Sequence, residues 1–107
     1  MRFDLVIFDC DGVLVDSEPI ANRILADILA GLGLPMRYEE TMRTFVGRSA
    51  AGCMTMIEER LGRALPHDFL LDWDARLFEA FRREVTPVAG VVGALDRIRT
   101  PVCVASS

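Results

Sequence analysis

Lysine is absent from the 107-residue sequence, in which all twelve basic residues are arginine. No lysine amine is therefore available for a Schiff base or for a contact with phosphate. Cysteine is scarce: Cys10, Cys53 and Cys103 are odd in number and lack the spacing of a metal site, so we interpret them as reduced packing thiols. No apolar stretch approaches the roughly 18 residues that cross a bilayer, and the N-terminus lacks the hydrophobic segment of a signal peptide. We expect a cytoplasmic protein with no membrane partner.

The composition is that of one small globular domain. Hydrophobic residues make up 51% of the chain and charged residues 26%, which is enough to bury a core and is not typical of disorder. The net charge of −4 argues against nucleic acid as a partner.

The hydrophobic pattern predicts strands at the two ends of the chain and helices between them. Residues 3–8 form a β-rich apolar run, which favours a parallel strand covered on both faces. From Pro19, apolar residues recur at helical spacing, with glycine and proline at the breaks. The expected helices run from about 18 to 32, about 38 to 46, about 50 to 61, from Pro66 onwards and from 91 to 99, and a second β-rich run, VCVA, follows Pro101.

The order of these elements predicts an α/β fold. One helix suffices to connect two parallel strands, so the block of four helices is surplus to that connection. We expect a Rossmann-like parallel-sheet core, formed by residues 1–16 and 87–107, with an inserted α-helical subdomain, residues 17–86. We call these regions the core and the cap, and we expect hinges near 15–18 and 85–89.

The sequence stops at the end of the second expected strand. Two strands of a parallel sheet are rarely stable alone. We therefore expect the chain to be the N-terminal part of a longer protein, truncated after the second core strand.

An acidic segment, VIFDCDGVLVDSE at residues 6–18, follows the first strand directly. Ligands of open parallel sheets bind outside the carboxyl ends of the strands, where Asp9, Asp11 and Ser106 would converge. A carboxylate pair at this place can hold Mg²⁺ together with a substrate phosphate. One aspartate can then act as nucleophile and the other as general acid and base. Backbone N–H groups around Gly12 can hold phosphate oxygens.

The full string D-x-D-G-V-L-V-D-S-E resembles motif I of the haloacid dehalogenase-like (HAD) hydrolase superfamily. The segment VCVASS resembles its motif II, and the helical block looks like its small α-helical cap. The resemblance implies that Asp9 is the nucleophile, that Asp11 is the general acid and base, and that Asp9 and the backbone carbonyl of Asp11 bind Mg²⁺. It implies that Gly12, Ser106 and Ser107 bind the phosphoryl group.

Two elements of the resembled family lie beyond residue 107, namely a lysine that offsets the charge at Asp9 and a later acidic pair that completes the metal site. We therefore expect the 107 residues alone to be inactive.

This sequence differs from particular branches of the superfamily, and these differences reduce the number of reactions that we expect. The dehalogenases lack the second aspartate of motif I, so Asp11 favours phosphoryl transfer. Phosphonoacetaldehyde hydrolases use a cap lysine, which this chain lacks. The β-phosphoglucomutase-like enzymes share the motif and the cap but carry a histidine early in the first cap helix, where this sequence has Ala21.

Three cap residues are candidates for substrate contact. The segment Phe45–Ser49 resembles the part of the cap that reaches into the site, which implicates Gly47 and Arg48. Arg48 can pair with a substrate phosphate or carboxylate, or can be a surface residue at a helix junction. Glu18 can meet substrate hydroxyls or simply start a helix. We interpret Trp73, Phe78 and Phe81 as part of the cap core.

These observations predict a Mg²⁺-dependent phosphohydrolase that acts on a small phosphorylated metabolite, with a sugar phosphate as one option, through an aspartyl-phosphate intermediate. The alternatives are a phosphosugar mutase of the β-phosphoglucomutase type and a non-catalytic fragment that keeps only the fold.

Overall fold

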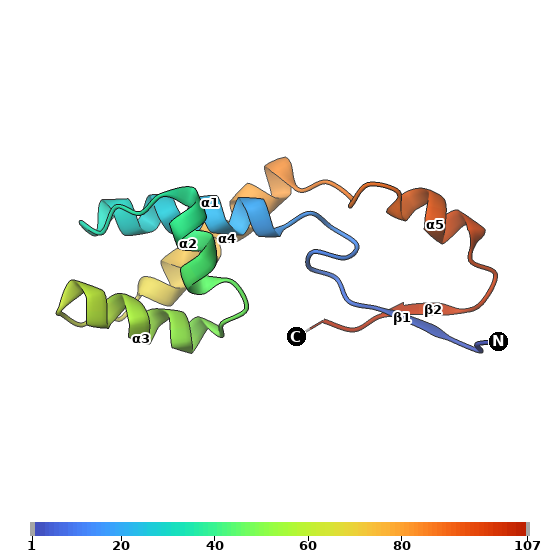
Figure 1. Cartoon of the computed structure of the whole chain (residues 1–107), viewed down its shortest axis with the longest axis horizontal. Coiled ribbons are helices and arrows are strands. Elements are labelled where there is room, and N and C mark those ends of the chain that lie inside the picture. Colours follow the sequence, from blue (N-terminus) through green and yellow to red (C-terminus); the bar gives the residue numbers. More distant parts are fainter. Residues whose placement is uncertain (1, 107) are drawn as a thin grey trace.

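The computed structural model of the chain describes residues 2–106. The molecule is elongated, with extents of 53 × 24 × 23 Å. Four helices gather at one end, and two strands with a fifth helix lie at the other (Figure 1). The elements, in chain order, are β1 (Val6–Phe8), α1 (Glu18–Gly31), α2 (Tyr38–Phe45), α3 (Ala50–Leu61), α4 (Phe69–Glu84), α5 (Val91–Arg97) and β2 (Val102–Val104).

The two strands pair in parallel, which confirms the predicted α/β fold with a helical insertion. Val6 pairs with Val102 and Phe8 pairs with Val104. The expectation that β1 is covered on both faces is wrong for the described residues, because the Ile7 side chain is 61% exposed. The reason is that this sheet has two strands and that α5 buries none of its residues.

The helices of the cap begin and end close to the predicted positions. Pro19 lies in the first turn of α1, where its missing N–H is not needed. The Ser49 hydroxyl accepts a hydrogen bond from the Gly52 N–H at 3.1 Å and so caps α3. Gly62 ends α3 with a φ of +71°, a left-handed conformation that suits glycine.

Several boundaries differ from the prediction. Helix α5 ends at Arg97 rather than at Arg99, and β2 ends at Val104. Helix α4 begins at Phe69, because Pro66–Asp68 form a turn in which the Phe69 N–H donates to the Pro66 carbonyl. Strand β1 covers Val6–Phe8 only, half of the predicted run.

The hydrophobic core of the described residues lies within the cap. Helix α1 packs against both α2 and α4. The apolar stripe predicted for α1 supplies Leu25, Ile28 and Leu29 to this core, and Leu29 is fully buried. The remaining members of the buried cluster are Phe45, Cys53, Ile57 and Phe69.

Two chain segments connect the core with the cap, and they run side by side. The Asp16 N–H donates to the Thr86 carbonyl at 2.8 Å, and the Val88 N–H donates to the Leu14 carbonyl at 3.0 Å. Val15 and Pro87 form an isolated antiparallel bridge between them. These pairs involve residues of both predicted hinges and Leu14, which directly precedes the first one. Within residues 2–106, none of the helices combines the length and apolarity that a membrane span requires.

Candidate active site

The acidic segment forms a compact loop at the carboxyl end of β1. The N–H groups of Val13 and Leu14 donate to the Cys10 carbonyl at 3.2 and 2.9 Å, and the Gly12 N–H donates to the Val15 carbonyl at 2.9 Å. Gly12 has a φ of +74°, which a residue with a Cβ rarely adopts. This loop turns the chain from β1 toward the cap and leaves the side chains of Asp9 and Asp11 exposed.

Each aspartate of the pair has a different hydrogen-bond partner. Asp9 Oδ1 accepts a hydrogen bond from the Cys10 N–H at 2.8 Å. Asp11 Oδ1 accepts one from the Ser17 hydroxyl at 3.1 Å. Two exposed carboxylates at the end of a strand are the kind of oxygen ligands that Mg²⁺ takes together with waters and a substrate phosphate.

The end of β2 lies beside the end of β1, as the sequence predicts. The Ala105 N–H donates to the Phe8 carbonyl at 2.8 Å, so Ser106 follows at the same edge of the sheet as Asp9. The Ser106 side chain is exposed. Ser107, the other predicted phosphate ligand of this strand, lies outside the described residues.

Glu18 contacts the loop from the cap side. A Cβ placed on Gly12 would lie 3.3 Å from Glu18 Oε1. Glycine at position 12 thus suits the backbone conformation and also leaves room for this carboxylate, which would have to shift slightly if a Cβ were present.

A cavity of about 460 Å³ lies between the core loop and the cap helices. It brings together Asp11, Glu18, Gly47 and Arg48, four of the residues predicted from the sequence. Asp9, Gly12 and Ser106 are not part of its lining. The remaining lining residues are Ala21, Asn22, Leu25, Phe45, Val46, Ala50, Cys53, Leu70, Trp73, Asp74 and Leu77.

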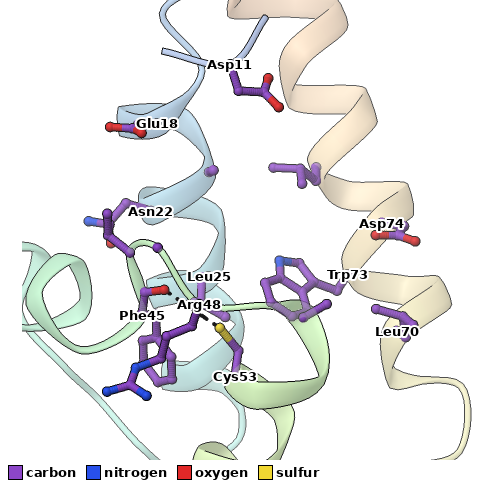
Figure 2. Close-up of a pocket in the computed structure, with 15 residues that line it drawn as sticks. Asp11, Glu18, Asn22, Leu25, Phe45, Arg48, Cys53, Leu70, Trp73 and Asp74 are labelled. Carbon is purple, nitrogen blue, oxygen red and sulfur yellow. Dashed lines mark hydrogen bonds between the residues drawn. The ribbon is translucent and has the colours of Figure 1, made fainter. Parts of the chain in front are cut away.

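The cavity has chemically different ends. Asp11 lies at one end and Arg48 near the other, with the side chain of Trp73 between α4 and α1 (Figure 2). Arg48 Nε donates to the Thr44 carbonyl at 2.8 Å, which fixes the guanidinium at the junction of α2 and α3. Arg48 is the single basic residue of this lining, whereas Asp11, Glu18 and Asp74 are acidic.

The Cys53 thiol lies beside the Arg48 end of the cavity. Burial raises the pKa of this thiol, and the positive charge of Arg48 opposes the rise. The buried thiol group contacts the Phe45 carbonyl at 3.8 Å. The cysteine therefore packs as a neutral thiol, in agreement with the interpretation from the sequence.

Within residues 2–106, no group of three or more His, Cys, Asp or Glu side chains is arranged to hold a metal ion. The aspartate pair can thus supply at most part of a cation site, which suits Mg²⁺ because this ion keeps several waters and needs one or two carboxylates.

Sequence reasoning missed several residues of the cavity. The apolar residues Leu70, Trp73 and Leu77 recur on one side of α4 and line the cavity, although Trp73 was expected to form cap core. The expectation that Phe78 belongs to the cap core is wrong, because Phe78 is 64% exposed and lies off this side of α4. Asp74 also lies on α4 and lines the cavity, but it belongs to none of the motifs found in the sequence. Asn22 is buried and donates to the Tyr38 carbonyl at 3.0 Å, so it joins α1 to α2 behind the cavity.

Comparison with known proteins shows to which family this sequence is similar. The family model described as haloacid dehalogenase-like hydrolase matches residues 3–107. The chain is 31% identical to the 6-phosphogluconate phosphatase of Escherichia coli strain K12 over 99% of its own length and 48% of that protein. It is also 31% identical to the phosphoglycolate phosphatase of Rhodobacter capsulatus, over 92% of its own length and 46% of the relative.

A solved structure shows the same fold. The conserved haloacid dehalogenase-like protein of unknown function from Agrobacterium tumefaciens strain C58 superposes with a TM-score of 0.84 at 37% identity, over 98% of this chain and 47% of that one. The chain therefore spans about half the length of the curated relatives and of the solved structure that it matches.

Proposed function

The chain belongs to the haloacid dehalogenase-like hydrolase family, and we propose that the intact protein hydrolyses phosphate monoesters of small metabolites through a phosphorylated aspartate. One observation carries this proposal. Asp11, which follows β1 in the acidic segment, and Arg48, which the cap contributes, line a single cavity. A phosphate monoester whose phosphate lies near the aspartates can then extend its organic part along the cavity toward Arg48.

The first step is the transfer of the phosphoryl group to the protein. A carboxylate oxygen of Asp9 attacks the phosphorus atom, and the bond from phosphorus to the ester oxygen breaks. Asp11 donates a proton to the departing oxygen, so the organic part leaves as a neutral alcohol.

The second step returns the protein to its starting state. Asp11, now a carboxylate, takes a proton from a water molecule that attacks the phosphorus atom of the aspartyl phosphate. The bond between phosphorus and Asp9 breaks, inorganic phosphate is released, and Asp11 again carries the proton that it gave up.

Mg²⁺ fits the oxygen-rich end of β1, where the Asp9 carboxylate and the backbone carbonyl of Asp11 would contribute to holding it, so that the Asp11 carboxyl group stays free for proton transfer. When bound, the ion would neutralise charge on the phosphoryl oxygens. The described residues supply the nucleophile, the proton donor and the cap wall of the cavity.

The lining of the cavity favours substrates that carry hydroxyl groups and an anionic end. The Arg48 guanidinium is suited to a carboxylate or to a second phosphate, and Glu18 is suited to accept hydrogen bonds from hydroxyls. A phosphorylated hydroxy acid or sugar acid meets both requirements. The two named relatives are phosphatases of phosphorylated acids, which supports this choice.

The residues that line the cavity give less support to mutase activity than to phosphatase activity. The superfamily branch with mutase activity carries a histidine early in the first cap helix. In this chain Ala21 lines the cavity from that helix, and the lining described above contains no histidine. His67 is exposed and lies before α4.

The proposal is tested by measuring phosphate release by the intact protein from a panel of phosphorylated sugars, hydroxy acids and sugar acids, with Mg²⁺ and with EDTA. We expect Mg²⁺-dependent release, abolished by Asp9→Asn. Asp16→Asn is the matched control, because Asp16 is also an exposed aspartate of the acidic segment but lies beside Thr86 in the connection to the cap, whereas Asp9 directly follows β1. Near-normal release by Asp9→Asn would refute the mechanism, and isomer formation without phosphate release would favour a mutase.

A further inference from the structure

Ser17 occupies an unusual position for a serine at the start of a helix. It is the residue directly before α1, where serine side chains commonly accept a hydrogen bond from the first turn of their own helix. The Ser17 side chain forms no such capping bond. Its hydroxyl donates instead to Asp11 Oδ1 at 3.1 Å.

The Ser17 side chain is also enclosed. The residue is only 3% exposed, although it lies next to the exposed Asp16 and Glu18. A buried hydroxyl is costly to leave without a partner, by about 1–3 kcal/mol. The Asp11 carboxylate is the partner that this hydroxyl has, so the buried Ser17 side chain favours one orientation of the exposed carboxylate.

The bond joins the two regions of the molecule. Among the side-chain hydrogen bonds of residues 2–106, it is the one that links a core residue to a cap residue. Beside it, the segments around Val15 and Pro87 are bridged to each other, so the start of α1 is anchored next to both connections. Any rotation of the cap about these connections would move Ser17 relative to Asp11.

We propose that Ser17 is a positioning residue for the proton transfer by Asp11, and that its hydroxyl ties the orientation of this carboxylate to the position of the cap. The inference rests on the proposed function, because it presupposes that Asp11 protonates the departing oxygen. Ser17 itself is not required to contact the substrate, since it does not line the cavity.

Substrates with different leaving groups separate this role from a structural one. An alkyl phosphate departs as an alkoxide unless the oxygen is protonated, whereas p-nitrophenolate departs without a proton. The value of kcat/KM reports the steps up to phosphoryl transfer, so it isolates the step in which Asp11 acts as the acid. Loss of positioning should therefore lower kcat/KM for the alkyl phosphate selectively.

The experiment compares the intact wild-type protein with Ser17→Ala, Ser17→Thr and Thr41→Val. The substrates are p-nitrophenyl phosphate and the alkyl phosphate of the panel that the wild type hydrolyses fastest. Since general acid catalysis contributes roughly a hundredfold or more, Ser17→Ala should lower kcat/KM for the alkyl phosphate by at least about tenfold more than for p-nitrophenyl phosphate. Ser17→Thr, which keeps a hydroxyl, should restore most of the loss.

Thr41→Val is the matched control for the loss of a buried hydroxyl in the cap. Thr41 is fully buried, and its hydroxyl donates to the Arg37 carbonyl rather than to the site. This variant should change both substrates by the same factor. An equal effect of Ser17→Ala on both substrates, or no effect on either, would overturn the positioning role while leaving the proposed function intact. If the wild type releases phosphate from neither substrate, the proposed function fails and this inference fails with it.

Discussion

Leu29 gives a direct test of the cap core. Its side chain is 0% exposed and lies on α1, the helix that packs against both α2 and α4. The change Leu29→Ala removes three carbon atoms, which corresponds to about 2.5 kcal/mol of lost transfer free energy. The cavity left behind adds to this loss, so we expect the free energy of unfolding to fall by about 3–4 kcal/mol.

The matched control is Leu71→Ala on α4. The same atoms are removed, but the Leu71 side chain is 74% exposed. We expect a change of at most about 0.5 kcal/mol at this surface position. The comparison separates burial from the intrinsic effect of replacing leucine by alanine in a helix.

Both variants can be measured by urea titration with tryptophan fluorescence. Trp73 is the single tryptophan of the chain, and its ring lies 5.8 Å from that of Phe69, a member of the buried cluster. The shift in midpoint multiplied by the slope m gives the change in free energy. Equal shifts for Leu29→Ala and Leu71→Ala would refute the assignment of the cap core.

Three further predictions concern the cavity and the ends of the helices. Arg48→Ala should raise KM for phosphorylated acids by about tenfold, because a charge-assisted hydrogen bond is lost, whereas Arg43→Ala on α2, outside the cavity, should leave KM unchanged. Burial raises the pKa of the Cys53 thiol, so the unfolded chain releases this proton first. The free energy of unfolding should therefore fall as pH rises above about 8.5, and Cys53→Ala should reduce that fall in urea titrations. Gly62→Ala should destabilise the protein by about 1 kcal/mol because of its positive φ, whereas Gly31→Ala, in open space at the end of α1, should stabilise it slightly in the same titration.

The helices were predictable because burial repeats with the helical period. Leu25, Ile28 and Leu29 stood out as a stripe in the sequence, and these residues are buried in the structure. Boundaries were less predictable where a proline can serve either a helix or a turn. The sequence predicts a helix from Pro66, but Pro66 belongs to a turn that precedes Phe69.

The cavity was only partly predictable. Asp11 and Arg48 were predicted from the family resemblance, and the structure places both in its lining. Trp73 was interpreted as core, because an apolar stripe looks the same in the sequence whether it faces packed side chains or the wall of a cavity. The direction of the Ser17 hydroxyl was not predictable either, since a serine before a helix ordinarily bonds to that helix.

The charges around the cavity bear on how a phosphorylated substrate could enter it. Asp11, Glu18 and Asp74 place three carboxylates in the lining, against the one guanidinium of Arg48. Two unit charges 4 Å apart interact by about 1 kcal/mol in water and by about 4 kcal/mol near a protein surface. A phosphate that approaches the Asp11 end, away from Arg48, therefore meets repulsion that no other basic residue of this lining offsets. In the proposed function, a divalent cation bound by Asp9 and Asp11 would make the electrostatic potential at that end positive. The cation would therefore be needed for the binding of the phosphorylated substrate as well as for phosphoryl transfer.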